Sequence, residues 1–226
     1  MTQTLFKDYQ DALHKLINEV LVRHLDTSDA IMLATSLKGL QFAHALAMKL
    51  RVDLDFLFSG SIYAPLNREC EIALVSETMG IIMHENLIQA FEISLDYVYG
   101  EAKRIYEEEI LSKIYKFRKG NMLKSLAHKN VFIVDQGIET GITAGLAIQT
   151  CMDKRAGSII VLAPIIPKAV EESLKRICDG VVSVYHPEHF VSIAHYYQCP
   201  LELDLSQIER IFEAIVNYPS LKDCKQ

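Results

Sequence analysis

The stretch Asn130 to Gly145, NVFIVDQGIETGITAG, decides the fold and the candidate site of this chain. It begins with a short apolar run, Val131 to Val134, that is rich in β-branched residues and typical of a buried strand in a parallel sheet. Asp135 ends the run. Glycines and threonines follow, and a helical pattern begins after Thr143. The stretch therefore predicts a strand, a loop of small residues and a helix.

A small-residue loop between a strand and a helix can bind a phosphate group. The helix N-terminus offers unpaired backbone N–H groups and a partial positive charge. Glycines let the backbone approach the anion, and threonine hydroxyls add hydrogen-bond donors. The alternative is an ordinary strand-to-helix turn, in which glycine and threonine are also common. The loop is neither a Walker A loop nor a dinucleotide-binding fingerprint, because it lacks Gly-Lys-Ser/Thr and Gly-x-Gly-x-x-Gly.

The order of residues in VDQGIETGIT resembles the signature of the type I phosphoribosyltransferases, which bind phosphoribosyl pyrophosphate (PRPP). The likeness is greatest to the predicted phosphoribosyltransferases of bacteria, although several motifs are degenerate. The usual signature is two acids, a few residues and then Thr-Gly-x-Thr. The resemblance implies that Asp135 holds the ribose hydroxyls and that the segment Glu139, Thr140, Gly141, Ile142 and Thr143 wraps the 5′-phosphate. Gln136 and Gly137, which precede this segment, would also bind the substrate.

Two positions depart from the family pattern by losing charge. Gln136 replaces the second acid, so it can hydrogen-bond a hydroxyl but brings no charge to favour a complex of PRPP with Mg²⁺. Gly60-Ser61 stands where the relatives carry an Arg-Lys pair. The change at Gln136 weighs against turnover more than against binding, and the change at Gly60-Ser61 removes two charges that would help neutralise pyrophosphate.

A second strand, loop and helix is predicted nearer the N-terminus. Asp29 to Thr35 indicates a buried strand, Ser36 to Leu40 a loop, and Gln41 to Leu50 a helix. Within the loop, Leu37, Lys38 and Gly39 resemble the Leu-Lys-Gly-Gly loop of the hypoxanthine-guanine enzymes. The resemblance implies that they hold pyrophosphate, with Lys38 as the cation. The alternative for Lys38 is a solvated loop lysine.

Composition restricts the class of protein. The 226 residues are half hydrophobic and carry a net charge of −6 without a basic block, so we expect no nucleic-acid partner. Five cysteines without close pairs indicate reduced thiols and no metal site. No apolar run approaches the roughly 20 residues that span a bilayer, and the N-terminus lacks a signal-peptide core. We therefore expect a cytoplasmic protein with no membrane contact.

Further elements follow from apolar periodicity, with Leu21 closing the apolar stripe of the first helix. The predicted helices are Phe6 to Leu25, Ser94 to Arg118, Lys168 to Ile177 and Leu205 to Val216, and the predicted strands are Val52 to Phe58, Glu71 to Glu77, Met79 to Met83, Ser158 to Ala163 and Gly180 to Tyr185. Alternating strands and helices predict an α/β fold with a doubly wound, mostly parallel sheet. We expect a single domain, 1–226, with a helical and hairpin insertion at about 60–125 and a small hood at about 186–226.

Two segments leave alternatives open. The basic segment Phe117 to Gly120 either covers bound phosphates or completes the preceding helix with a C-terminal charge and a glycine. Aromatic side chains of the tail, Phe190, Tyr196 and Tyr197, either stack on a base or pack against the core. The neighbouring histidines lack the spacing of a metal site, so they are interpreted as ordinary polar residues.

Two functions of different classes fit the residues. The first is an enzyme that transfers ribose 5-phosphate from PRPP to a nitrogenous base and releases pyrophosphate, with Mg²⁺ accompanying PRPP. Asp135 and Glu139 would be its catalytic residues, because Glu139 lies where hypoxanthine-guanine enzymes carry an acid facing the purine. The second is a regulatory protein that binds PRPP or a nucleotide without chemistry. The resemblance also implies a homodimer, and the acceptor base is left open.

Overall fold

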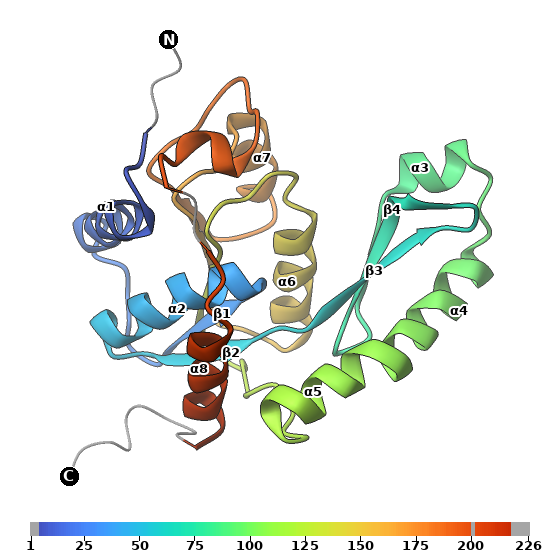
Figure 1. Ribbon diagram of the computed structural model, residues 1–226, viewed down its shortest axis with the longest axis horizontal. Coiled ribbons are helices and arrows are strands. Elements are labelled where there is room, and N and C mark those ends of the chain that lie inside the picture. The colour runs from blue at the N-terminus through green and yellow to red at the C-terminus, as the bar shows by residue number, and fades with distance from the viewer. Residues whose placement is uncertain (1–4, 200–201, 218–226) are drawn as a thin grey trace.

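The computed structural model describes residues 5–199 and 202–217. Its centre is a sheet of five parallel strands in the order β2-β1-β6-β7-β8 (Figure 1). The strands are β1 (Ala30–Ala34), β2 (Asp53–Phe56), β6 (Asn130–Val134), β7 (Ser158–Leu162) and β8 (Gly180–Val182). The predicted doubly wound α/β fold is therefore confirmed.

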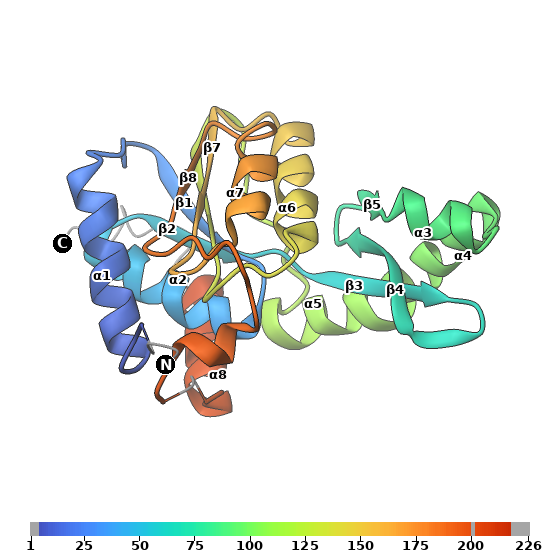
Figure 2. The ribbon, with the colours of Figure 1, turned by 90° about the horizontal axis from the view of Figure 1, so that it is seen from above.

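Helices cover both faces of this sheet, as Figure 2 shows. Successive strand residues point to opposite faces, so in β1 Met32 joins one apolar cluster while Ile31 and Leu33 join the other. The helices of the first cluster are α1 (Tyr9–Val22), α2 (Leu37–Leu50) and α8 (Leu205–Asn217), and those of the second are α6 (Ile142–Asp153) and α7 (Lys168–Leu174). Burial on both faces explains why β1, β6 and β7 are almost continuously apolar, whereas the edge strand β2 carries Asp53 and Asp55.

The first helix shows how closely periodicity predicted the elements. Asp8 caps α1 by accepting a hydrogen bond from the backbone N–H of Asp11 at 2.9 Å. Leu13, Leu16, Ile17 and Val20 are buried as predicted. Leu21 was wrongly assigned to the apolar stripe, since it lies outside the buried face and is 48% exposed.

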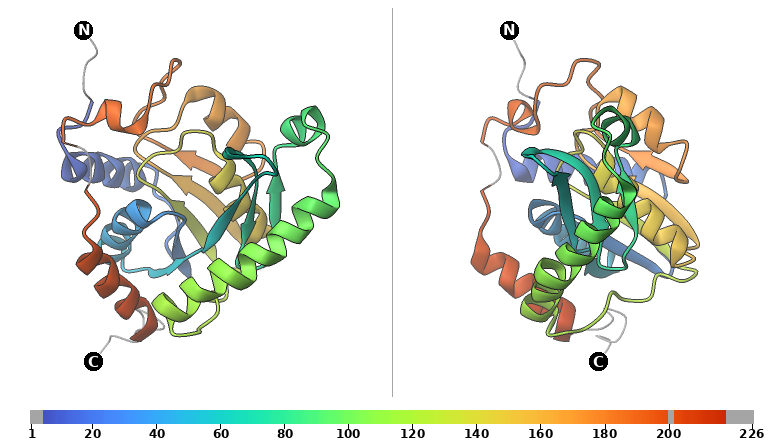
Figure 3. Two further views of the ribbon diagram at one scale, coloured as in Figure 1. Left: turned by 45° about the vertical axis from the view of Figure 1, so that its right-hand side comes forward. Right: turned by 90° about the vertical axis from the view of Figure 1, so that its right-hand side faces the viewer.

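Residues 59–118 form an extension, called the arm below, that projects away from the parallel sheet beyond α6 (Figure 2). Its sheet is antiparallel and comprises β3 (Ser59–Ala64), β4 (Asn67–Ser76) and β5 (Ile81–Met83). Its helices are α3 (Glu85–Ala90), α4 (Leu95–Ile105), the π-helix η1 (Tyr106–Ile110) and α5 (Leu111–Arg118). Figure 3 shows α4, η1 and α5 running as one rod along the arm, so the predicted hairpin and long helix are confirmed.

The tail returns over the core. A short 3-10 helix, η2 (Ile193–Tyr196), precedes Tyr197, and the side chains of Tyr196 and Tyr197 are each only 6% exposed. Packing against the core is therefore the alternative that holds for these two tyrosines. The parts of the predicted hood at 200–201 and 218–226 lie outside the described residues. No helix in the described part of the chain combines the length and apolar character needed to cross a membrane.

Candidate functional site

A cleft of about 290 Å³ opens where β1 and β6 end. Thr35 and Ser36 follow β1, and Asp135 follows β6, so their side chains meet at the carboxyl edge of the sheet. Ligands of open parallel sheets bind at this edge. The cleft is lined by Thr35, Ser36, Ile133, Asp135, Gln136, Gly137, Ile138, Glu139, Thr140, Gly141, Thr143, Ala144 and Ile193.

The structure brings together most of the residues predicted to bind phosphate. Every predicted residue of the loop after β6 lines the cleft except Ile142, which is the first residue of α6. Thr35, Ser36 and Ile193 line it without having been predicted. Thr35 and Ser36 could have been found because they follow a predicted strand next to the loop, whereas nothing in the local sequence marks Ile193.

The carboxylate of Asp135 is held by three hydrogen-bond donors. Ser36 Oγ donates to Oδ1 at 2.8 Å, Thr35 Oγ1 donates to Oδ2 at 3.2 Å, and the backbone N–H of Gln136 donates to Oδ1 at 2.7 Å. Desolvation raises the pKa of Asp135 to about 6, against the opposing effect of these hydrogen bonds. At neutral pH the side chain is therefore an oriented anion that can accept hydrogen bonds from sugar hydroxyls.

The predicted loop from Ser36 to Leu40 is wrong, because α2 begins at Leu37. Ser36 is its N-cap and accepts a hydrogen bond from the backbone N–H of Gly39 at 2.9 Å. Leu37, Lys38 and Gly39 thus form the first turn of a helix, outside the residues that line the cleft. A Cβ atom on Gly39 would lie 3.0 Å from Asp135 Cα, so this glycine allows α2 to pack against the end of β6.

The loop after β6 ends in a helix start that suits an anion. Gly141 has φ +80°, a conformation that favours glycine, and α6 begins after it without a side-chain cap. The first N–H groups of such a helix have no partner within the helix. Thr140 and Thr143 place hydroxyl groups on the wall beside them. The geometry matches the predicted phosphate loop, and binding itself stays a prediction.

The tail closes one side of the cleft. Glu139 Oε1 accepts a hydrogen bond from the backbone N–H of Ile193 at 3.2 Å, and the Tyr197 hydroxyl donates to the carbonyl of Gln136 at 3.2 Å. A Cβ atom on Gly137 would lie 2.9 Å from Ile193 Cγ1. Glu139 is exposed at the rim of the cleft. One of its carboxylate oxygens contacts the tail, and the side chain is accessible to a ligand.

The lining of the cleft is acidic. Among the described residues that form it there is no lysine or arginine, and there are two carboxylates, Asp135 and Glu139. Gly60 and Ser61 lie in β3 of the arm, where a Cβ on Gly60 would overlap the side chain of Ile105. A phosphate in this cleft would be bound mainly by backbone N–H groups, hydroxyls and the dipole of α6.

The basic segment at the end of the long helix does not supply the missing charge. Arg118 is the last residue of α5, is 1% exposed, and pairs with Asp55 and Glu77. Lys119 and Gly120 follow with positive φ values of 52° and 83° and complete the helix. For Arg118, therefore, the suggestion that this segment covers bound phosphates is wrong. Its partners are distant in sequence, so no local pattern indicated them.

Comparison with known proteins supports the resemblance. Two curated proteins of Mycobacterium tuberculosis, from strains CDC 1551 and H37Rv, are both named "putative phosphoribosyl transferase". Each is 24% identical to this chain over 197 residues, which are 86% of this chain and 43% of the relative. The chain thus spans less than half the length of these curated relatives. No protein-family model matches the chain.

A solved structure shows that the fold is shared. The crystal structure of the protein TT1426 from Thermus thermophilus aligns with 94% of this chain and 98% of its own, with a TM-score of 0.74 and 20% sequence identity. The chain therefore has the fold of that protein. The similarity to proteins named phosphoribosyl transferases, inferred from VDQGIETGIT, is confirmed.

Proposed function

We propose that this chain binds PRPP and transfers its ribose 5-phosphate group to a nitrogenous base, with release of pyrophosphate. The observation that carries the proposal is the meeting of Asp135 with the Thr140–Thr143 loop in one cleft, at the start of α6. This arrangement has the elements that a ribose 5-phosphate group requires: an anion site for the phosphate and an oriented carboxylate for the ribose hydroxyls.

In the proposed reaction a nitrogen of the base forms a bond to C1 of the ribose while the bond from C1 to the pyrophosphate oxygen breaks. The phosphate loop and Asp135 hold the sugar, so the reaction gains chiefly from positioning and from stabilisation of the cationic sugar. Glu139 at the rim accepts the proton that leaves the base nitrogen. Its contact with Ile193 orients the carboxylate.

Mg²⁺ would enter this site together with PRPP. Among the described residues, no three or more His, Cys, Asp or Glu side chains are placed to hold a metal ion. The carboxylates of Asp135 and Glu139 are oxygen ligands of the kind that Mg²⁺ accepts beside substrate phosphates. The ion would neutralise part of the charge of pyrophosphate.

The second candidate is a regulatory protein that binds PRPP or a nucleotide 5′-phosphate without turnover. The acidic cleft favours it, because the described lining offers no cation to the highly charged pyrophosphate. Gln136 also favours the regulatory candidate, because its neutral side chain brings no charge to favour a complex of PRPP with Mg²⁺. Such a regulatory protein would prefer a ligand with a single phosphate ester, such as a nucleoside monophosphate.

Isothermal titration separates the two candidates. PRPP and ribose 5-phosphate are titrated with and without Mg²⁺, and pyrophosphate release is then measured over a panel of bases. The enzyme predicts binding of PRPP and base-dependent release of pyrophosphate. Binding of ribose 5-phosphate or a nucleotide without release supports the regulator, and the absence of binding by every ligand contradicts both.

We further propose that the protein acts in the cytoplasm and as a homodimer. Cys70, Cys151, Cys178 and Cys199 are free thiols, as expected in a reducing compartment. The net charge of −6 argues against a nucleic-acid partner. Sedimentation of the purified chain tests the dimer.

A further inference from the structure

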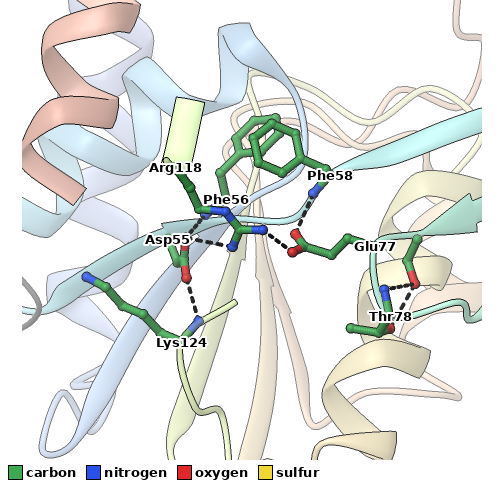
Figure 4. A network of polar contacts seen from close by, with 8 residues as sticks. Asp55, Phe56, Phe58, Glu77, Thr78, Arg118 and Lys124 are labelled. Atoms are coloured by element: carbon green, nitrogen blue, oxygen red, sulfur yellow. Dashed lines mark hydrogen bonds and ion pairs between the residues drawn. The ribbon is translucent and has the colours of Figure 1, made fainter. Parts of the chain in front are cut away.

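A buried arginine joins the arm to the parallel sheet. Arg118 Nη2 pairs with Glu77 Oε2, and Arg118 Nη1 lies 3.5 Å from Asp55 Oδ1 (Figure 4). All three side chains are 0 to 1% exposed. Asp55 belongs to β2 of the parallel sheet, while Glu77 directly follows β4 and Arg118 ends α5 of the arm. The ion pairs thus connect two separate sheets.

Backbone donors hold the remaining oxygens of the two carboxylates. The N–H of Phe58 donates to Glu77 Oε1 at 2.9 Å, and the N–H of Lys124 donates to Asp55 Oδ2 at 2.7 Å (Figure 4). The guanidinium also lies over the ring of Phe58 at 5.0 Å from its centroid. Burial raises the pKa of both carboxyl groups, and the charge of Arg118 opposes this rise. Removing Arg118 would therefore leave two buried carboxylates without the guanidinium that pairs with both.

Residues 76–80, which include Glu77, form a tight turn. The backbone N–H of Ser76 donates to the carbonyl of Gly80 at 2.9 Å, and the N–H of Gly80 donates to Ser76 Oγ at 3.2 Å. Ser76 Oγ also lies 2.9 Å from Thr78 Oγ1. Glu77 is inside this turn, so its pairing with Arg118 ties the turn to the end of α5.

Beyond the turn, the arm touches the helix that follows the phosphate loop. A Cβ atom on Gly145 would lie 2.9 Å from Ile82 Cδ1, so β5 packs directly against α6. Gly145 is in the first turns of α6, and its N–H donates to the carbonyl of Gly141 at 2.8 Å. Arg118 thus pairs with Glu77, the turn at Glu77 joins β4 to β5, and Ile82 of β5 packs against Gly145 near the end of the phosphate loop.

We infer that Arg118 is a positioning residue for the phosphate loop: by pairing with Asp55 and Glu77 it holds β5 against α6 at Gly145. The inference rests on the proposed function, since it concerns the same phosphate site. Protein interiors transmit small shifts between neighbouring elements because they have low compressibility. When the pairing is weakened, β5 withdraws from Gly145, and the first turn of α6 loses the support that orients its N–H groups.

The test is the affinity for ribose 5-phosphate, measured by isothermal titration well below the unfolding temperature. Glu77→Gln removes one charge, and its amide oxygen still accepts from the N–H of Phe58. Arg118→Met removes the guanidinium. We expect each variant to bind ribose 5-phosphate about twofold to thirtyfold more weakly, the range for coupling through a packed network. Arg104→Met is the matched control, because Arg104 pairs with Glu101 and Glu108 on the exposed side of the same arm.

A purely structural role predicts a different result. In that case Glu77→Gln and Arg118→Met unfold at lower temperatures, but the folded variants bind ribose 5-phosphate with the wild-type affinity. That outcome overturns the inference. Failure of the wild-type chain to bind ribose 5-phosphate instead contradicts the proposed function. Arg104→Met should keep the wild-type affinity, and an equal loss in this variant overturns the inference.

A measurement on the wild-type chain covers the case in which both variants fail to fold. Hydrogen exchange is followed with and without saturating ribose 5-phosphate. The inference predicts slower exchange for the N–H groups of Phe58 and Gly80 when the ligand binds, although neither residue lines the cleft. Unchanged exchange at both residues, with protection confined to the cleft, overturns it.

Discussion

The hydroxyl of Ser36 donates a hydrogen bond of 2.8 Å to Asp135 Oδ1, between residues 99 positions apart. The same hydroxyl accepts from the backbone N–H of Gly39 and so caps α2. One side chain therefore starts a helix and orients the carboxylate of the candidate site. This explains why the segment predicted as a pyrophosphate loop is helical and packs against Asp135.

Ser36→Ala should weaken both the fold and ligand binding. Loss of an N-cap costs about 1 kcal/mol of unfolding free energy. Asp135 also loses a donor, so affinity for ribose 5-phosphate should fall. Ser94→Ala is the control, because Ser94 caps α4 in the arm by accepting from the N–H of Tyr97 at 3.2 Å. Urea unfolding should show similar losses for both variants. If Ser36→Ala and Ser94→Ala bind ribose 5-phosphate with equal affinity, Ser36 acts on stability alone.

Asp135→Asn should change how stability depends on pH. The pKa of Asp135 is about 6 in the folded chain and about 4 when unfolded. Between these values the folded chain binds more protons, so its free energy of unfolding falls as pH rises and levels off above about 6. The variant lacks this loss. From pH 4 to 7 it should gain about 1 to 2 kcal/mol relative to wild type, a figure reduced for partial solvent exposure.

Urea unfolding at several pH values measures this effect. Asp204→Asn provides a contrast of opposite sign, because hydrogen bonds from Ser206 and Gln207 hold the pKa of the exposed Asp204 below its usual value. Parallel profiles for wild type and Asp135→Asn would contradict the raised pKa of Asp135.

Thr143→Val should weaken phosphate binding while keeping the shape of the side chain. A lost hydrogen bond to a charged group corresponds to about 1 to 3 kcal/mol of binding free energy. Thr150→Val is the matched control on the same helix, since the Thr150 hydroxyl is buried and donates to the carbonyl of Leu146 at 2.9 Å. Titration with ribose 5-phosphate gives both affinities. If the two variants bind equally well, Thr143 is not a phosphate ligand.

Glu139→Gln should lower turnover and leave PRPP affinity nearly constant. A glutamine oxygen can still accept from the N–H of Ile193, so the contact with the tail survives while the base is lost. Loss of a general base lowers the rate by about 100-fold or more. Steady-state kinetics should show a fall in kcat with PRPP binding unchanged. Full activity of Glu139→Gln on every accepted base would exclude Glu139 as the base.

Gln136→Asp should make PRPP binding depend more strongly on Mg²⁺. The substitution restores the second acid of the family signature, and the added charge favours the complex of PRPP with the cation. Gln136→Asn is the neutral control, because asparagine has the same size as aspartate. Titrations at several Mg²⁺ concentrations measure the dependence. One common Mg²⁺ response for the wild type and both variants would contradict the role assigned to position 136.

Local patterns predicted much of the fold. The apolar run at Val131 to Val134, the stripe on α1 and the long helix ending at Arg118 all depend on residues close in sequence, whose periodicity reports burial directly. The loop after β6 is similarly local, because its glycines and threonines follow one another along the chain. Seven of its predicted site residues consequently line the cleft.

What the sequence by itself determined is the parallel sheet and the loop between β6 and α6, because each depends on neighbouring residues. Only the tertiary structure decided that Ser36 caps a helix and binds Asp135, and that Ile193 meets Glu139. It also decided that the basic segment buries Arg118 between Asp55 and Glu77 instead of presenting it to a ligand. These partners lie 41 to 99 positions apart. Their pairing depends on the path of the chain and on desolvation, which no local pattern contains.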